Sequence, residues 1–316
     1  MNIRAWLSGL GIAVCVVSAS VGSSDEHRVT IDAGKERISV RVDGTLFTTL
    51  HADKAAQKLY LHPLNSASGR RVTRAFPMEK VAGESTDHAH QRGVWIGAER
   101  LSGLDFWENE PSYEATNKGV VLMTGVTDVR SGVGEGRFTL DAVWNAPTGQ
   151  TLLNETRTMT FKAQDDRRIV DLDLRLLAKT SVTFEDNHDA LLGLRLGTAF
   201  EEAHGGKAVN AEGKTGWESL RGARSAWVDW RATVEGEDLG VMVMDHPSNF
   251  RFPTPWHVRD YALLFASPFA SRDYSPTAPD GSLTLEPGKD LRVRYRIVVH
   301  GASFDAARAF QEYAGR

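Results

Sequence analysis

Apolar and polar residues alternate along much of this 316-residue chain in short runs. Gly, Asp, Asn or Pro ends most of these runs, as in RVTIDAG, ERISVRVDG, KLYLHPL and GRFTLDAVWNAP. Longer alternating runs cover residues 151–161, 168–177 and 291–300. A period of two places the apolar side chains on one face of a strand, so these runs predict sheets with one buried and one solvated face.

The runs are too numerous for one small barrel, because they predict about fifteen strands or more, which favours two large sheets packed face to face. Only residues 303–313 have helical spacing, with Ser303 as a candidate N-cap and an apolar stripe formed by Phe304, Ala307, Phe310 and Tyr313. No repeat or linker divides the chain. We therefore expect an all-β fold, a large two-sheet β-sandwich with one C-terminal helix, in a single domain over residues 25–316.

Residues 1–22 have the layout of a secretory signal peptide, with an apolar run from Ala5 to Val17 followed by small residues. This run is shorter than the roughly 20 residues of a bilayer span, so we expect cleavage near residues 19–22 and export, to the periplasm in the simplest case. The alternatives are an uncleaved anchor and a lipoprotein attached through Cys15. Since Cys15 is the only cysteine, the exported chain would contain no disulfide.

The net charge of −4 and the absence of a long basic run argue against a nucleic-acid partner. No glycine-rich loop lies between a predicted strand and helix, so we expect no nucleotide cofactor. After removal of the signal peptide, a metal would have to bind through His and carboxylate groups, which suits Ca, Mn or Zn. After that cleavage, no later stretch is long and apolar enough for stable insertion in a membrane.

The segment DHAHQRGVWIGAERLSGLDFW, residues 87–107, has the densest collection of functional side chains. On an extended strand, His88, His90 and Arg92 would leave the same face. The two imidazoles could then serve as acid and base or share a metal, and the guanidinium could bind an oxygen of the substrate. Ordinary strand histidines are the alternative. Further candidates to orient an imidazole or bind substrate are Asp87, Trp95, Asp105 and Trp107.

Three other polar clusters supply candidate substrate-binding residues: Asp186 with His188, His246 with Asn249, and Trp256 with His257 and Arg259. In the last cluster, His257 and Arg259 repeat the same-face spacing and could form the opposite wall of a pocket. Tryptophan rings could stack on sugar rings, although they are also ordinary core residues. Solvated loops and turn capping are the alternative roles for the first two clusters.

The run YLHPLNSASGRRVTRAFPME, the DHxHxRGxW motif, and the later segments LLGLRLG, AWVDW, VMDHPSN and WHVRDYALLFASPF resemble a bacterial family labelled "methane oxygenase PmoA". The label conflicts with this chain, because membrane methane oxygenase subunits have several spans. The resemblance implies an exported protein of sugar catabolism, often encoded near sugar oxidoreductases. The predicted sandwich is also similar to the galactose-mutarotase class, which places histidines and a carboxylate on a concave sugar-binding face.

These observations predict an exported carbohydrate-active lyase that removes the C1 substituent of a 3-keto glycoside by β-elimination. His88 and His90 would act as base and acid in either order, with His257 in reserve. Arg92, Arg259 or a divalent cation held by His88 and His90 would stabilise the enolate. Alternatives are glycoside hydrolysis by a carboxylate pair drawn from Asp105, Glu108, Glu110 and Asp186, and a non-catalytic sugar-binding or mutarotase-like protein.

Overall fold

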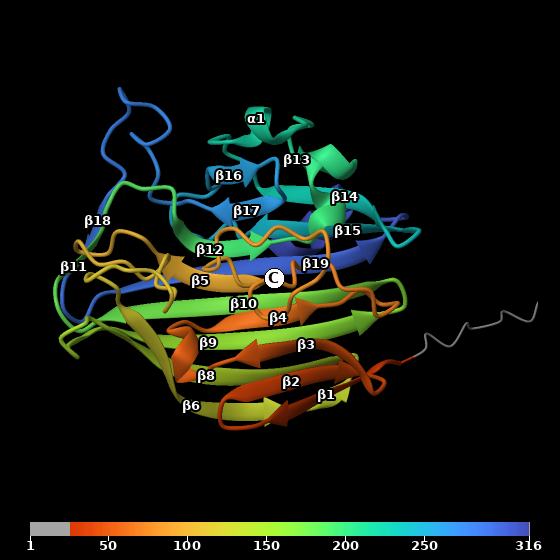
Figure 1. Cartoon of the computed structure of the whole chain (residues 1–316), viewed down its shortest axis with the longest axis horizontal. Coiled ribbons are helices and arrows are strands. Elements are labelled where there is room, and N and C mark those ends of the chain that lie inside the picture. The colour runs from red at the N-terminus through yellow and green to blue at the C-terminus, as the bar shows by residue number, and fades with distance from the viewer. Residues whose placement is uncertain (1–25, 316) are drawn as a thin grey trace, which may run out of the picture.

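A computed structural model describes residues 26–315 of the chain (Figure 1). The predicted signal peptide, its cleavage region and Cys15 lie outside the described residues.

Within the described residues, two large antiparallel sheets form the protein. The first sheet has nine strands in the spatial order β16 (Trp256–Arg259), β17 (Leu263–Ala266), β12 (Ala190–Arg195), β5 (Val94–Ala98), β4 (Tyr60–Leu64), β3 (Thr45–His51), β2 (Arg37–Val42), β1 (Arg28–Ala33) and β7 (Gly132–Val133). The second sheet has eight strands in the order β13 (Lys207–Asn210), β14 (Trp227–Val234), β15 (Glu237–Asp245), β19 (Asp290–Gly301), β10 (Arg167–Ala178), β9 (Thr151–Gln164), β8 (Glu135–Asn145) and β6 (Val120–Arg130). A small ladder pairs β11 (Val182–Phe184) with β18 (Leu283–Leu285).

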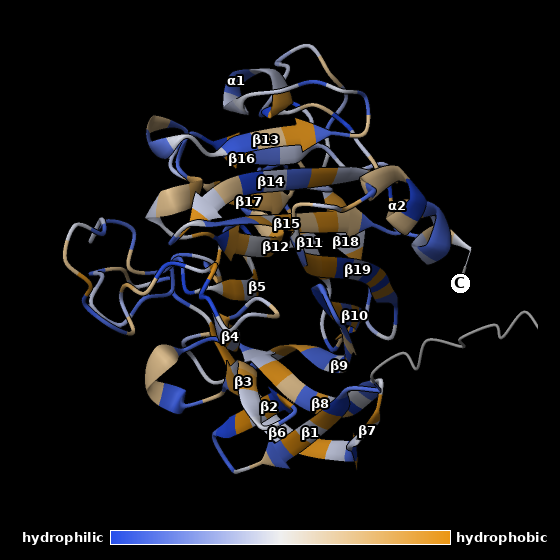
Figure 2. Cartoon of the chain, turned by 90° about the vertical axis from the view of Figure 1, so that its right-hand side faces the viewer, coloured by the Kyte–Doolittle hydropathy of each residue, from blue (hydrophilic) through white to orange (hydrophobic). Residues whose placement is uncertain are grey.

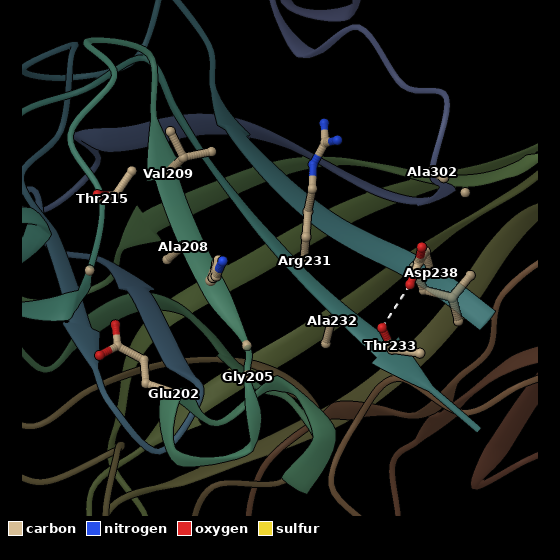
Figure 3. A pocket seen from close by; sticks show the side chains of 15 residues that line it. Glu202, Gly205, Ala208, Val209, Thr215, Arg231, Ala232, Thr233, Asp238 and Ala302 are labelled. Atoms are coloured by element: carbon tan, nitrogen blue, oxygen red, sulfur yellow. Dashed lines mark hydrogen bonds between the residues drawn. The ribbon is translucent and has the colours of Figure 1, made fainter. Parts of the chain in front are cut away.

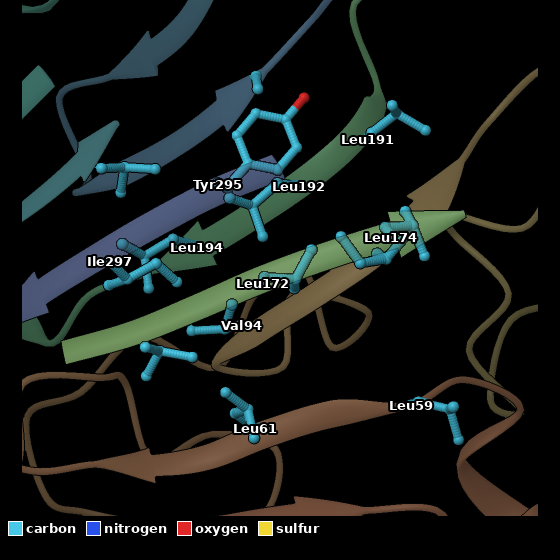
Figure 4. Packing of buried hydrophobic residues seen from close by; sticks show 14 of the residues in the cluster. Leu59, Leu61, Val94, Leu172, Leu174, Leu191, Leu192, Leu194, Tyr295 and Ile297 are labelled. Atoms are coloured by element: carbon cyan, nitrogen blue, oxygen red, sulfur yellow. The ribbon is translucent and has the colours of Figure 1, made fainter. Parts of the chain in front are cut away.

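The two sheets pack face to face around one hydrophobic core to which both contribute (Figure 2). Leu61, Val94 and Leu194 from the first sheet face Leu172 and Ile297 from the second (Figure 4). The period-two pattern produces this core directly: along β8, every second residue from Gly136 to Trp144 is buried. The predicted all-β two-sheet sandwich is therefore confirmed.

The C-terminal helix α2 (Ala306–Ala314) is also confirmed, but its predicted start and stripe are partly wrong. Asp305, not Ser303, is the N-cap, and its carboxylate accepts a hydrogen bond from the backbone N–H of Arg308 at 3.0 Å. Phe304 precedes the helix, and Ala307 is exposed. The side chains that pack α2 on the outer face of the second sheet are Ala306, Ala309, Phe310 and Tyr313.

The remaining helical elements in residues 26–315 are short: α1 (Trp217–Leu220) and the 3-10 turns η1 (Lys54–Ala56), η2 (Thr198–Phe200) and η3 (Glu202–His204). None of the helices described has the length and apolar character needed to cross a bilayer.

Candidate active site

A row of aromatic and imidazole side chains crosses the outer face of the first sheet. The strand registers place the members directly opposite one another, strand by strand, in the order His257, Phe265, Gly193, Trp95, Tyr60 and His51. Their neighbours in sequence point into the core between the sheets, so this row belongs to the other face. Trp107 packs onto the row, with its ring centroid 4.9 Å from that of Trp95 and 5.0 Å from that of Phe265.

Gly193 allows the row to be continuous. A Cβ atom at this position would lie 2.5 Å from ring atoms of Trp95, which is closer than van der Waals contact permits. The absence of a side chain on β12 thus lets the Trp95 indole lie across the strand. The result is a buried aromatic cluster in which the Trp107 ring is tilted by 55° from that of Trp95. Trp95 and Trp107 were predicted to bind substrate, but both are buried and form part of the packing beneath the site.

The segment carrying His88 and His90 is not a strand, so the same-face argument for these residues is wrong. His88 has a φ of +45°, and the backbone N–H of Gln91 bonds to the carbonyl of His88 at 3.0 Å, which closes a turn. The strand begins only after Gly93, where a Cβ atom would lie 2.2 Å from the carbonyl oxygen of Leu61. The turn nevertheless brings the two imidazoles together, with ring centroids 5.8 Å apart.

Buried Arg74 holds this turn in place. Its guanidinium donates to the carbonyl of Asp87 at 3.0 Å, to the carbonyl of His88 at 2.9 Å and to the carboxylate of Asp87 at 2.8 Å. Burial opposes ionisation of Asp87, but a hydrogen bond from Ser85 and the charge of Arg195 hold its pKa below the usual value. A charged carboxylate is therefore fixed beside His88.

His88 is the more accessible of the two imidazoles, with 41% of its side chain exposed. Its Nδ1 lies 3.1 Å from a carboxylate oxygen of Asp87, and its ring stacks on Tyr261 at a centroid distance of 5.6 Å. When Nδ1–H faces the carboxylate, Nε2 carries the lone pair. This arrangement can remove a proton from a bound ligand.

His90 is buried beside the hydroxyl of Tyr113, which lies 3.2 Å from its Nδ1. Burial, together with the nearby charge of Lys58, lowers the pKa of His90 to about 2, so the imidazole is neutral near pH 7. Its Nε2 lies 3.9 Å from a carboxyl oxygen of Glu108. Burial and the charges of Asp105 and Glu99 raise the pKa of Glu108, so this half-exposed acid keeps its proton to a higher pH than usual.

Lys58 lies beneath the loops that carry His90 and Trp107. It was not among the site residues predicted from the sequence. Its ammonium is fully buried and donates to the carbonyl of His90 at 3.2 Å and to the carbonyl of Trp107. Burial lowers the pKa of Lys58 to about 7. The run KLYLH contained the signal, because Lys58, Tyr60 and His62 share the face opposite the leucines.

Arg92 is not free to bind a substrate oxygen. Its guanidinium forms two hydrogen bonds with the carboxylate of Glu110, at 2.9 and 2.7 Å, and lies over the ring of Tyr60. Glu110 is correspondingly unavailable as one of a hydrolytic pair. This bidentate pair joins the turn that precedes β5 to the loop that follows Trp107.

The second pair of histidines lies at the other end of the aromatic row. The rings of His188 and His257 stack at 4.2 Å, and His257 stacks on Phe265 at 4.5 Å. Nδ1 of His188 bonds to Asp273, and Nδ1 of His257 lies 3.2 Å from the hydroxyl of Tyr274. The placement of His257 and Arg259 on one face of β16 agrees with the sequence analysis.

Asp189 is a further acid that the sequence analysis overlooked among the loop residues 185–189. Its carboxyl lies 3.8 Å from Nε2 of His188. Burial, reinforced by the charges of Glu99 and Glu108 although opposed by His188, raises the pKa of Asp189 to about 7. Acidic groups with raised pKa values therefore gather where β12 begins and β5 ends.

Cationic groups gather at the opposite ends of the same strands. Arg195, on β12, is fully buried with its guanidinium 4.4 Å from the centroid of Tyr261. Arg259, on β16, lies 5.1 Å from the same ring. The Nε atoms of both arginines are buried without a hydrogen-bond partner.

The other predicted site residues have structural contacts. Asp105 caps a turn by accepting from the backbone N–H groups of Trp107 and Glu108 at 2.7 and 2.8 Å. Asp186 accepts from the backbone N–H groups of Ser271, Arg272 and Gly281 at 2.7–2.9 Å, and so anchors the loop 271–281.

Three predicted residues are not brought to the histidine face. Trp256 points into the sandwich core and donates to the carbonyl of Ser225 at 2.8 Å. His246 packs on Tyr313 of α2 at 5.1 Å, beyond the second sheet. Asn249 bonds to the side chain of Asp245 at 2.7 Å in the turn after β15.

The predicted metal ligands His88 and His90 lie together, but they have no third protein ligand among the described residues. Within residues 26–315, no group of three or more His, Cys, Asp or Glu side chains is close enough to hold an ion. His88 and His90 would supply two nitrogen ligands, whereas structural and catalytic zinc sites use three or four protein ligands. The residues present do not form a complete set, so we assign no catalytic step to a metal.

A cavity of about 890 Å³ lies elsewhere, near the edge strand β13 (Figure 3). Glu202, Lys207 and Arg231 line it, and Thr233 donates to Asp238 at 2.7 Å on its wall. It contains none of the predicted site residues. The clustered imidazoles, acids and guanidiniums on the first sheet, not the volume of this cavity, define the candidate active site.

The fold and site together describe a two-sheet β-sandwich that carries titratable groups on the outer face of one sheet. The chain belongs to the family described as "Family of unknown function (DUF6807)", whose model matches residues 37–314. The methane-oxygenase label does not appear in this match. No curated protein matches the sequence.

Several solved structures have a similar arrangement of strands. A galactose mutarotase-like protein from Lactobacillus casei is 11% identical, with 86% of this chain and 100% of that chain covered and a TM-score of 0.40. A putative aldose 1-epimerase from Escherichia coli K12 is 10% identical, with coverages of 87% and 99% and a TM-score of 0.37. A heparan sulfate lyase HepC mutant from Pedobacter heparinus is 10% identical, with coverages of 90% and 36% and a TM-score of 0.37. No activity follows from likenesses at this level.

Proposed function

We propose that this protein is an exported lyase that removes the C1 substituent of a 3-keto glycoside by β-elimination. The observation that carries the proposal is the pair of adjacent imidazoles, 5.8 Å apart, one held by a carboxylate and the other beside an acid with a raised pKa. Tyr261 is partly exposed and its ring stacks with that of His88, so it offers a surface beside the imidazoles on which a sugar ring can stack.

In the proposed reaction, Nε2 of His88 removes the proton at C2, which the neighbouring ketone acidifies. The electron pair of that bond forms the C1=C2 double bond as the C1–O bond breaks. The departing oxygen takes a proton from Glu108, whose carboxyl lies 3.9 Å from Nε2 of His90. Water is not consumed, and the products are an unsaturated keto sugar and the free alcohol.

Arg259 is the guanidinium best suited to offset the enolate charge, since Arg92 is occupied by Glu110. Arg259 and His88 both contact the ring of Tyr261, so the base and the positive charge lie on the same part of the face. A divalent cation is not needed for these steps, and a chelator tests that part of the prediction.

Hydrolysis by a pair of carboxylates has less support. Three of the four candidate acids are engaged: Asp105 and Asp186 by backbone N–H groups, and Glu110 by Arg92. Glu108 alone presents a partly exposed carboxyl without a strong partner. A hydrolase needs a second free carboxylate on the other side of the glycosidic bond.

Turnover of matched 3-keto and unoxidised aryl glycosides, with and without a chelator, tests the proposal. We expect release from the keto substrate alone, no effect of chelator, and a loss of about 100-fold or more in His88→Ala. His204→Ala is the matched control, because His204 is 54% exposed and lies on η3.

Other outcomes contradict the proposal in different ways. Release from the plain glycoside would identify a hydrolase, anomer exchange without cleavage a mutarotase, and binding without release a sugar-binding module. Full turnover in both His88→Ala and His90→Ala would exclude the assigned site.

A further inference from the structure

Arg221 and Arg259 form a cationic corner beside the proposed active site. Arg259 follows His257 by two residues on β16, and its guanidinium lies 5.6 Å from the ring centroid of Trp217. Trp217 begins α1, and Arg221 is the C-cap of this helix, with its backbone N–H donating to the carbonyl of Trp217 at 2.9 Å. Burial is the main cause of the low pKa of His257, and the charges of Arg221 and Arg259 both lower it further.

This corner has more positive charge than its surroundings neutralise. In the part of the chain that the structure describes, neither Arg221 nor Arg259 forms an ion pair or a side-chain hydrogen bond, and Nε of Arg259 is buried without a partner. Glu202, which lies beside α1, accepts from the backbone N–H of Trp217 at 2.7 Å and forms no ion pair with either arginine. A buried donor without an acceptor costs free energy, so an acceptor from outside the chain is expected.

Arg195 adds a third charge behind Tyr261. The nearest carboxylate oxygen, on Asp87, is 3.6 Å from its Nη2 and is already bonded to Arg74 at 2.8 Å. The Nε and Nη2 atoms of Arg195 form no hydrogen bonds. Arg195 and Arg74 therefore share the carboxylate of Asp87, and Arg195 and Arg259 both lie over the ring of Tyr261.

We propose that Arg221 and Arg259 bind the oxyanion of an acidic sugar, either the carboxylate of a uronide or the phosphate of a sugar phosphate. A planar guanidinium is suited to both groups. The adjacent rings of Trp217 and Tyr261 provide apolar surface for the sugar itself. This inference rests on the proposed function for the identity of the ligand as a sugar, and it names the substrate class of the same site.

The elimination chemistry requires one guanidinium near the enolate, which Arg259 supplies. Arg221 has no part in that chemistry, and it is exposed, so its substitution should not disturb folding. The two arginines can thus be separated: Arg221→Gln should change only the recognition of the charged group, whereas Arg259→Gln should change both recognition and turnover.

Isothermal titration of the full chain with methyl glucuronide, its neutral methyl ester, glucose 6-phosphate and inorganic phosphate tests the inference. One of the two acidic sugars should bind at least about tenfold more tightly than the neutral ester, with a preference that weakens as salt is added. Whichever binds identifies the carboxylate or phosphate source. Arg221→Gln should abolish the preference and Arg308→Gln, on exposed α2, should retain it.

Equal binding of the acidic sugars and the neutral ester would overturn the inference, as would a preference that survives in both Arg221→Gln and Arg259→Gln. Inorganic phosphate binding as tightly as the sugar phosphate, with no response to the glucuronide, would reduce the corner to a simple anion site. The proposed function fails separately: an anion preference that depends on Arg221, without turnover of any keto glycoside, would leave this inference standing and remove the elimination.

Discussion

Replacement of Lys58 by methionine tests whether a buried amine holds the active-site loops together. The ammonium of Lys58 donates to the carbonyls of His90 and Trp107, and the side chain is fully buried. The carbonyl of His90 also accepts from the backbone N–H of Arg92 at 3.1 Å, so it keeps a partner in the variant. The carbonyl of Trp107 has no second donor among the described residues and would be left unsatisfied.

An orphaned buried acceptor costs about 1–3 kcal/mol, which is the expected fall in the free energy of unfolding. For a domain of this size that corresponds to a melting temperature lower by about 2–10 °C. Methionine also removes the cost of burying an amine, so we expect the lower half of these ranges. Because the Trp107 loop carries Glu108, turnover of the keto glycoside should fall more than stability alone explains.

The pH dependence of stability gives a second test of the role of Lys58. Burial lowers the pKa of Lys58 from 10.5 to about 7, so between these values the unfolded chain binds more protons than the folded chain. The contribution of Lys58 to the free energy of unfolding therefore rises with pH across this window. The free energy of unfolding of Lys58→Met, measured by urea titration, should rise less steeply from pH 7 to 10 than that of the wild type. Lys35→Met, at an exposed turn, is the control.

Equal stability, an unchanged pH slope and unchanged turnover in Lys58→Met would together refute this reasoning.

Three further changes test the scaffold of the site. Gly193→Ala would place Cβ 2.5 Å from the ring of Trp95 and should lower the free energy of unfolding by about 1–3 kcal/mol. Gly125→Ala is the control, because a Cβ at that position meets nothing within 4 Å. Equal midpoints of urea unfolding for the two variants would contradict this packing. Asp186→Asn should accelerate amide hydrogen exchange in residues 271–281, and unchanged exchange there would show that the loop does not depend on this carboxylate. Burial raises the pKa of Asp245 from 3.8 to about 7, so its stabilising contribution is present below about pH 4 and is lost as pH rises through 7. The free energy of unfolding of Asp245→Asn should therefore fall less than that of the wild type between pH 4 and 7. Parallel pH profiles of the variant and the wild type would contradict this role of Asp245.

Much of the fold follows from local patterns in the sequence. The alternating runs at 151–161, 168–177 and 291–300 lie within β9, β10 and β19, which pair side by side in the second sheet. Period-two alternation also predicts that His257 and Arg259 share a face, because both lie within one strand. The helix at the C-terminus was predictable from its spacing, although its cap was not, since Ser303 and Asp305 are both good N-cap residues.

The details of the site depend on tertiary contacts that no local pattern contains. The positive φ of His88 follows from the clamp of Arg74, a residue distant in sequence, so the strand predicted there could not be excluded from the segment itself. Likewise, the sequence cannot show that Glu110 occupies Arg92, or that backbone N–H groups occupy Asp186. Burial, which is also non-local, gives Lys58 and Asp189 their shifted pKa values.

The fate of the C2 proton tests the central claim most directly. Incubation of a 3-keto glycoside with the protein in deuterated water enriched in oxygen-18, followed by mass spectrometry and ultraviolet absorbance, distinguishes elimination from hydrolysis. The account predicts an unsaturated keto sugar that absorbs as a conjugated enone, formed without incorporation of solvent oxygen and lost in His88→Ala. A saturated sugar carrying solvent oxygen at C1, released with full activity by His88→Ala, would contradict it.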